Sequence, residues 1–202
     1  MFRDAIFSKN EFVDIITAVI VLGSAFTIAL TADFNVAVNS YFTLYYLVPI
    51  GFLGAITAFL MHELAHRQMA IRYGGAAHFR LWPLGLLLSL ITSPFGFLFA
   101  APGAVQIYAI DKPQHIGIVA LAGPATNLIL GILFMASSSV LTGYAHGITL
   151  YVGEINAIMC LFNLIPIPPL DGYKVLKWDF RPYIIIISLA ILTEIYVVRG
   201  LI

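Results

Sequence analysis

Long, mostly apolar runs alternate with short polar segments along the whole chain. A helix that crosses a bilayer needs about 20 consecutive, mostly apolar residues. The runs that meet or approach this length are residues 13–32, 42–71, 115–144, 148–165 and, somewhat shorter, 182–198. This pattern predicts an all-α fold, a polytopic transmembrane helix bundle with about five spans.

A sixth apolar stretch, residues 81–110, is long enough to cross the membrane but does not fit a regular helix. It has no charged residue and is interrupted by Pro83, Gly85, Pro94, Gly96, Pro102 and Gly103. Proline breaks a helix interior and glycine weakens it. Two interpretations remain open: a re-entrant hairpin, with or without short β-strands, and a kinked helix that crosses completely.

The positions of lysine and arginine favour the hairpin. Cytoplasmic loops collect these residues near the ends of spans. If residues 81–110 enter and leave on one side, nine of the ten Lys and Arg residues lie on that side and only Arg199 lies opposite. A full crossing removes this bias. Because irregular backbone inside a membrane must be covered by protein or line a wet cavity, the hairpin is a candidate wall of an active site.

The composition agrees with a membrane protein. Hydrophobic residues make up 61% of the chain and charged residues 10%, with a mean hydropathy of +0.98. A soluble domain carries about 25% charged residues, so lipid is the expected solvent, and residues 1–202 are expected to form one integral-membrane domain. The formal net charge is zero, so no long-range field favours nucleic acid as a partner.

One short motif carries candidate chemistry: His62-Glu63-Leu64-Ala65-His66. Residues four apart lie on one helix face, so the two imidazoles can bind one metal ion. In such a motif the glutamate acts as general base toward water at the metal. The alternative is a pair of histidines satisfied by helix neighbours. Ionisable groups in an apolar run are costly and usually functional, so zinc binding is preferred.

A catalytic zinc usually has three protein ligands and one open position. His146 is predicted on the opposite side of the membrane, and interfacial solvation accounts for His78 and His115. Asp171 is the better candidate, because the prolines that precede it break the helix and let its carboxylate reach into the bundle. It is also predicted at the same depth as His66. The alternative is an aspartate that caps the following turn.

Three segments together resemble the site-2 protease family of intramembrane zinc metalloproteases: HELAH at 62–66, GPATN at 123–127 and NLIPIPPLDG at 163–172. The resemblance covers about residues 44–178, the expected metal-site core. It implies one zinc ion held by His62, His66 and Asp171, with Glu63 as catalytic base. It also suggests Asn127 as a polar group near the substrate carbonyl and an oxyanion donor, although an interhelical hydrogen bond would explain it equally well. Asn163 is expected to shape the site.

The expected function is hydrolysis of peptide bonds in transmembrane protein substrates, in the cell membrane, with the zinc site toward the cytoplasmic side. A helical substrate must unwind, and residues 97–105 are the candidate strand edge that pairs with it. Ala101, Gly103 and Val105 are candidate substrate contacts; the alternative is a lipid-anchoring loop. A zinc protease for soluble or lipid-modified tails, and a zinc transporter or sensor, are the competing functions.

Three further ionisable residues, Asp14, Glu154 and Glu194, lie within apolar segments. Each is near the end of a predicted span, where interfacial solvation is sufficient. No catalytic role is assigned to them.

Overall fold

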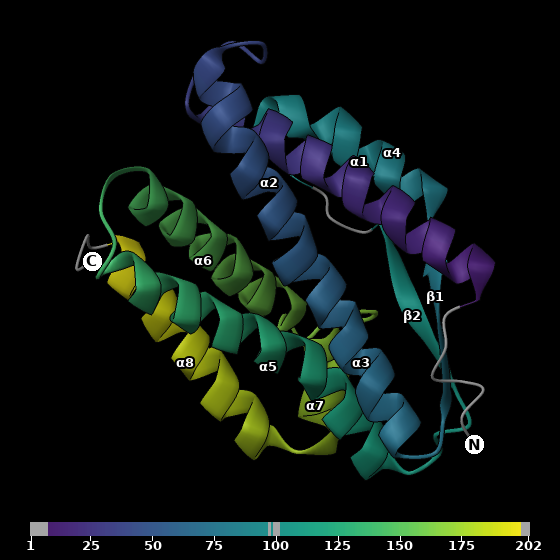
Figure 1. Cartoon of the computed structure of the whole chain (residues 1–202). Helices are drawn as coiled ribbons and strands as arrows, with labels where there is room; N and C mark the ends of the chain where they lie inside the picture. Colours follow the sequence, from purple (N-terminus) through teal and green to yellow (C-terminus); the bar gives the residue numbers. More distant parts are fainter. Residues whose placement is uncertain (1–7, 97, 99–101, 199–202) are drawn as a thin grey trace.

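The computed structural model describes residues 8–96, 98 and 102–198. The chain folds into a helical bundle with one small sheet (Figure 1). The helices are α1 (Lys9–Asp33), α2 (Val48–Gly54), α3 (Met61–Arg72), α4 (Pro83–Thr92), α5 (Pro113–Ser138), α6 (Gly143–Asn163), α7 (Asp171–Trp178) and α8 (Phe180–Val198). The strands are β1 (Ala76–Leu81) and β2 (Gly103–Tyr108).

Within the described residues, four helical segments are long and apolar enough to cross a membrane. They are Lys9–Asp33, Thr43–Arg72, Pro113–Ser138 and Gly143–Asn163. The second contains α2 and α3, joined without a break by a π-helical turn at Ala55–Leu60, and a similar turn at Thr43–Leu47 precedes α2. The fifth predicted span corresponds to α8, which is helical but not among these four. The prediction of an all-α polytopic membrane bundle is confirmed.

The long segment that contains α2 and α3 runs between two groups of helices (Figure 1). On one side α5, α6 and α8 pack together, and on the other α1 packs against α4. The segment contacts both groups, through α1 and through α5 and α6. The histidine motif on α3 is therefore held in the interior of the bundle.

The stretch predicted as a hairpin does return to its starting point. β1 and β2 pair antiparallel, with Leu81 opposite Gly103 and Ala76 opposite Tyr108. The helix between them, α4, has only 10 residues. The pairing is what the re-entrant interpretation requires, although the side of the membrane remains a prediction.

The strand lies further along the chain than predicted. β2 begins at Gly103, so it overlaps only the end of the expected edge at residues 97–105. Of that stretch, residues 97 and 99–101, including the candidate contact Ala101, lie outside the described residues.

Carboxylates of α1 cover the outer edge of β1. Glu11 Oε1 accepts the Phe79 N–H at 2.9 Å, and Asp14 Oδ2 accepts the Leu81 N–H at 3.4 Å. Glu11 also pairs with Arg67 of α3 at 3.4 Å, which ties the sheet to the helix that carries the histidines. Exposed strand edges invite further strands. One edge of the sheet is thus occupied by side chains, and the edge of β2 faces the bundle.

Glu154 lies deeper than the sequence indicated. The apolar run predicted a span that starts at residue 148, but α6 begins five residues earlier, at Gly143. The first turn of α6 contains polar residues, so a prediction based on apolar residues placed the start of the helix too late. Glu154 therefore lies near the middle of α6 rather than near its end.

Candidate metal centre

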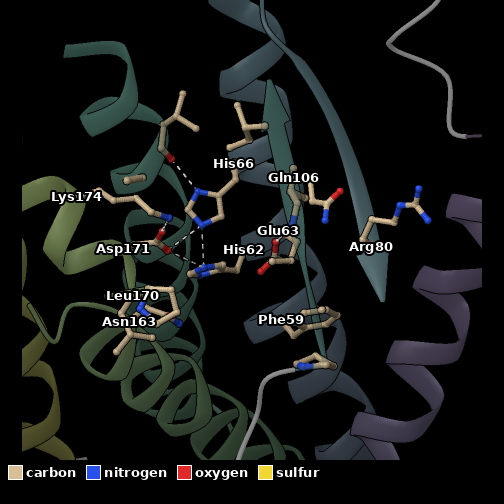
Figure 2. Close-up of a pocket in the computed structure, with 18 of the residues that line it drawn as sticks. Phe59, His62, Glu63, His66, Arg80, Gln106, Asn163, Leu170, Asp171 and Lys174 are labelled. Atoms are coloured by element: carbon tan, nitrogen blue, oxygen red, sulfur yellow. Dashed lines mark hydrogen bonds and ion pairs between the residues drawn. The ribbon is translucent and has the colours of Figure 1, made fainter. Parts of the chain in front are cut away.

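Two imidazoles and one carboxylate converge in the bundle interior (Figure 2). His62 and His66 come from α3, one helical turn apart, and Asp171 is the first residue of α7. Nε2 of His66 lies 2.9 Å from Nε2 of His62 and 2.9 Å from Oδ2 of Asp171. Nε2 of His62 lies 3.3 Å from the same carboxylate oxygen. All three residues are buried, and they are the three that the sequence predicted as ligands.

The chain between α6 and α7 explains how Asp171 reaches the histidines. Residues 164–170 form turns that contain three prolines, so α6 cannot continue. Gly172 lies so close to the Leu164 carbonyl that an added Cβ would collide with it. The absence of a side chain at Gly172 lets α7 start tightly against the end of α6, with Asp171 turned toward α3.

Hydrogen bonds fix the orientation of both imidazole rings. Nδ1 of His66 lies 2.7 Å from the Val119 carbonyl, and Nδ1 of His62 lies 2.5 Å from Oδ1 of Asn127. Both partners are acceptors on α5, so each Nδ1 carries the hydrogen and donates. A donor contact of this kind at the second ring nitrogen is usual for histidines that bind metal.

Because both Nδ1 atoms carry the hydrogen, lone pairs of His62 Nε2, His66 Nε2 and Asp171 Oδ2 face one another. With hydrogen on Nδ1, the two Nε2 atoms and Oδ2 of Asp171 are all acceptors, and nothing in the group supplies a hydrogen. A cation among them removes this repulsion. The distances of 2.9 to 3.3 Å approach the separation of about 3.3 Å between ligands of a tetrahedral zinc ion. The donor set therefore fits zinc, with a fourth position left for water or substrate.

The carboxyl group of Asp171 is held in its ionised form. Burial alone would raise its pKa, but the contacts with His66 and His62 hold that pKa well below its usual range. Its second oxygen, Oδ1, accepts a hydrogen bond from Lys174 Nζ at 3.2 Å. Ionised carboxylate is the form that binds a metal, and Lys174 leaves only Oδ2 directed at the histidines.

Glu63 lies next to this group but takes no part in it. Its carboxylate turns toward β2, where Oε2 accepts the Val105 N–H at 2.8 Å (Figure 2). A carboxylate beside the metal site, but not bound to it, is placed to accept and release protons. The structure thus separates Glu63 from the three candidate ligands, as the motif predicts.

The candidate ligands and Glu63 border a cavity of about 1060 Å³, here called the metal cavity. Gly103 and Val105 of β2 line its opposite wall, and Asn163 lines it from the end of α6. Asn163 donates to the Met159 carbonyl at 3.0 Å. Their contacts with substrate remain predictions.

Asn127 is placed differently from the expected oxyanion donor. It is fully buried, and its amide nitrogen donates to the Ala58 carbonyl at 2.9 Å and to Oδ1 of Asn156 at 3.2 Å. Both amide hydrogens are therefore used inside the protein. The structure shows the alternative, an interhelical hydrogen-bond network that positions His62, and this arrangement leaves Asn127 no hydrogen for a substrate.

The sequence reasoning missed two supporting residues, Lys174 and Asn156, and gave Gly123 no role although it begins the segment 123–127. Asn156 could have been noticed as a polar residue within an apolar span. Gly123 lies where α5 passes the two imidazoles, and a Cβ there would be 2.6 Å from Nε2 of His62 and in collision with Nε2 of His66. Only the absence of a side chain lets α5 approach the site so closely.

Replacing Gly123 with alanine is expected to weaken zinc binding by at least about tenfold, because the methyl group must displace one or both imidazoles. Competition with a fluorescent chelator measures the affinity. Gly131→Ala is the matched control on the same helix, since its nearest contact is a backbone oxygen at 3.3 Å, remote from the histidines. Equal zinc affinity in both variants would contradict this interpretation of Gly123.

The fold and the site together define a membrane protein with a zinc-type centre. The chain is 36% identical over 177 residues to MJ0611 of Methanocaldococcus jannaschii, named as a zinc metalloprotease, and the match covers 86% of each chain. It is 31% identical to YwhC of Bacillus subtilis, over 66% of this chain and 72% of the relative. Rip2 of Mycolicibacterium smegmatis is 28% identical, over 71% of this chain and 61% of the relative. Both also carry the name of zinc metalloprotease.

No family model and no solved structure matches the chain. The similarity to MJ0611 nevertheless covers most of both chains at more than 30% identity. The chain belongs to this family of zinc metalloproteases.

Proposed function

We propose that this zinc metalloprotease is of the site-2 type and hydrolyses peptide bonds within transmembrane substrate proteins. The observation that carries the proposal is the position of the His62, His66 and Asp171 cluster, buried between helices long enough to cross a membrane. A protease for soluble chains has no need to place its centre there. The metal cavity, with Glu63 on its wall, gives a membrane segment space beside these residues.

Different residues of the chain would bind the metal, transfer the proton and orient the imidazole rings. His62, His66 and Asp171 would hold one zinc ion, which when bound lowers the pKa of water and polarises a carbonyl group. Glu63 takes a proton from the attacking water as its oxygen bonds to the scissile carbon. The same carboxylic acid then gives that proton to the leaving nitrogen as the carbon–nitrogen bond breaks. Asn127 and Val119 keep the two imidazole rings in orientation.

The edge of β2 supports a specific way to bind an unwound substrate. Val105 donates outward to Glu63 rather than to β1, so its backbone groups face the metal cavity. An extended segment added to this edge would satisfy its own backbone groups and lie along the wall opposite the histidines. The outer edge of β1 is occupied by Glu11 and Asp14, which leaves β2 as the edge for pairing.

Transmembrane proteins are accordingly the proposed partners, and the cell membrane is the proposed location, with the site toward the cytoplasmic side. The competing function is cleavage of soluble or lipid-modified tails by the same chemistry. The discriminating substrate is a single-span peptide with a flexible tail, offered to the reconstituted, zinc-loaded protein. Mass spectrometry of the products is expected to place the cut inside the span. Cuts confined to the tail, also made in the tail peptide alone, would support the competing function.

A further inference from the structure

A second cavity, of about 510 Å³, lies beside the metal cavity. It is bounded by the C-terminal half of α1, by α6, and by Gly96 and Leu98. Its walls are mostly apolar, with Phe26, Leu30, Ile155 and Ile158 among the lining residues. We call it the acidic cavity, because Asp33 and Glu154 also line it.

The two cavities share walls. Met159 and Phe162 of α6 line both of them. On the opposite side, β2 borders the metal cavity, and Gly96 and Leu98, which precede β2 in the chain, border the acidic cavity. An extended segment that pairs with β2 and continues past its Gly103 end is therefore directed into the acidic cavity.

Asp33 and Glu154, the two carboxylates of this cavity, have no counter-ion among the residues that the structure describes. Asp33 is exposed at the end of α1, and half-buried Glu154 lies near the middle of α6. Glu154 is close enough for its charge to interact with those of Asp33 and, on α8, Glu194. Ion pairs in the described part of the chain involve Glu11 and Asp171, and neither Asp33 nor Glu154 takes part in one. An acidic side chain among membrane helices, as Glu154 is, is costly and normally pairs with a cation. The cavity thus combines apolar walls with negative charge that has no counter-ion among the described residues.

We propose that the acidic cavity is a substrate subsite that accepts a lysine or arginine side chain of the membrane segment being cut. The inference rests on the proposed function and adds a specificity to it. The apolar stem of such a side chain suits the walls, and its charged end suits the carboxylates. Charge-assisted hydrogen bonds of this kind are stronger than neutral ones. A substrate with an apolar residue at this position leaves the repulsion between Asp33 and Glu154 in place.

A lysine scan of a substrate tests the subsite. The zinc-loaded full chain, reconstituted in lipid, receives an apolar single-span peptide and a series that carries one lysine at successive positions. We expect one window of positions, on one side of the cut, where kcat/KM exceeds that of the lysine-free parent by about tenfold. Glu154→Gln is expected to bring this ratio close to one. Asp111→Asn, a change of an exposed carboxylate in the loop before α5 and outside the cavity lining, is the matched control and keeps the wild-type ratio.

Exchanging the charges of residue 154 and of the substrate side chain tests the subsite more strictly. With Glu154→Lys, a glutamate at the best position of the window is expected to be preferred over lysine. A flat scan in wild type, with the parent peptide still cut, would overturn the subsite and leave the proposed function standing. Failure to cut any peptide of the series would overturn both. Zinc content and melting temperature show that each variant is folded, and the wild-type scan needs no variant at all.

Discussion

Replacing Asp171 with asparagine is expected to lower the affinity for zinc by more than about 100-fold, because it removes a ligand and its negative charge together. The neutral amide carries no negative charge, so it no longer balances part of the charge of a divalent cation bound by the two Nε2 atoms. Zinc content after dialysis against a weak chelator measures the loss, and cleavage should fall with it.

The control for this change is Asp111→Asn, an exposed carboxylate in the loop before α5. It should keep the full zinc content. The melting temperature without metal should be similar in the two variants, because α7 is also held by Val175 in the core. Zinc retained at wild-type affinity in Asp171→Asn would show that the third ligand lies elsewhere.

Replacing Glu63 with glutamine is expected to reduce cleavage by about 10³-fold while the zinc content stays unchanged. The amide oxygen can still accept the Val105 N–H, so the wall of the metal cavity is preserved. What is lost is the ability to take a proton from water and return it to the leaving nitrogen. Turnover of a membrane peptide and zinc content are measured on the same preparation.

Two outcomes of this experiment have different meanings. Loss of cleavage together with loss of zinc would indicate that Glu63 supports the metal rather than the proton transfer. Cleavage near the wild-type rate would remove Glu63 from the mechanism altogether. Asp111→Asn again serves as the comparison, as an exposed carboxylate that does not line the metal cavity.

The membrane helices and the three candidate ligands were predictable because each depends on a local signal. Apolar length predicted the spans, and the spacing of four residues put His62 and His66 on one face. The prolines before Asp171 marked the place where a helix must end and a side chain can turn inward. Such signals need no knowledge of which helices are neighbours.

The remaining features depend on contacts between distant segments. Asn127 looked available for a substrate until Ala58 and Asn156, from two other helices, were found to use its hydrogens. Gly123 gains its importance only from the imidazoles that pass beside it. The start of β2 was shifted because pairing with β1, rather than the local sequence, decides where a strand begins.

Glu154 illustrates the same limit for function. Its depth depended on where α6 begins, and a helix end is uncertain when polar residues such as His146 lie in its first turn. Placed near the middle of α6 and beside Asp33, it became the centre of a proposed subsite rather than an interfacial carboxylate.

The most direct measurement is a zinc titration of metal-stripped protein, reconstituted in lipid with a single-span peptide, while hydrolysis and the cut site are followed by mass spectrometry. We predict no hydrolysis before zinc is added, saturation at one zinc ion per chain, and a cut inside the membrane span. A fully zinc-loaded, folded protein that leaves the span intact, or hydrolysis that proceeds equally without zinc, would contradict the assignment of this chain as an intramembrane zinc protease.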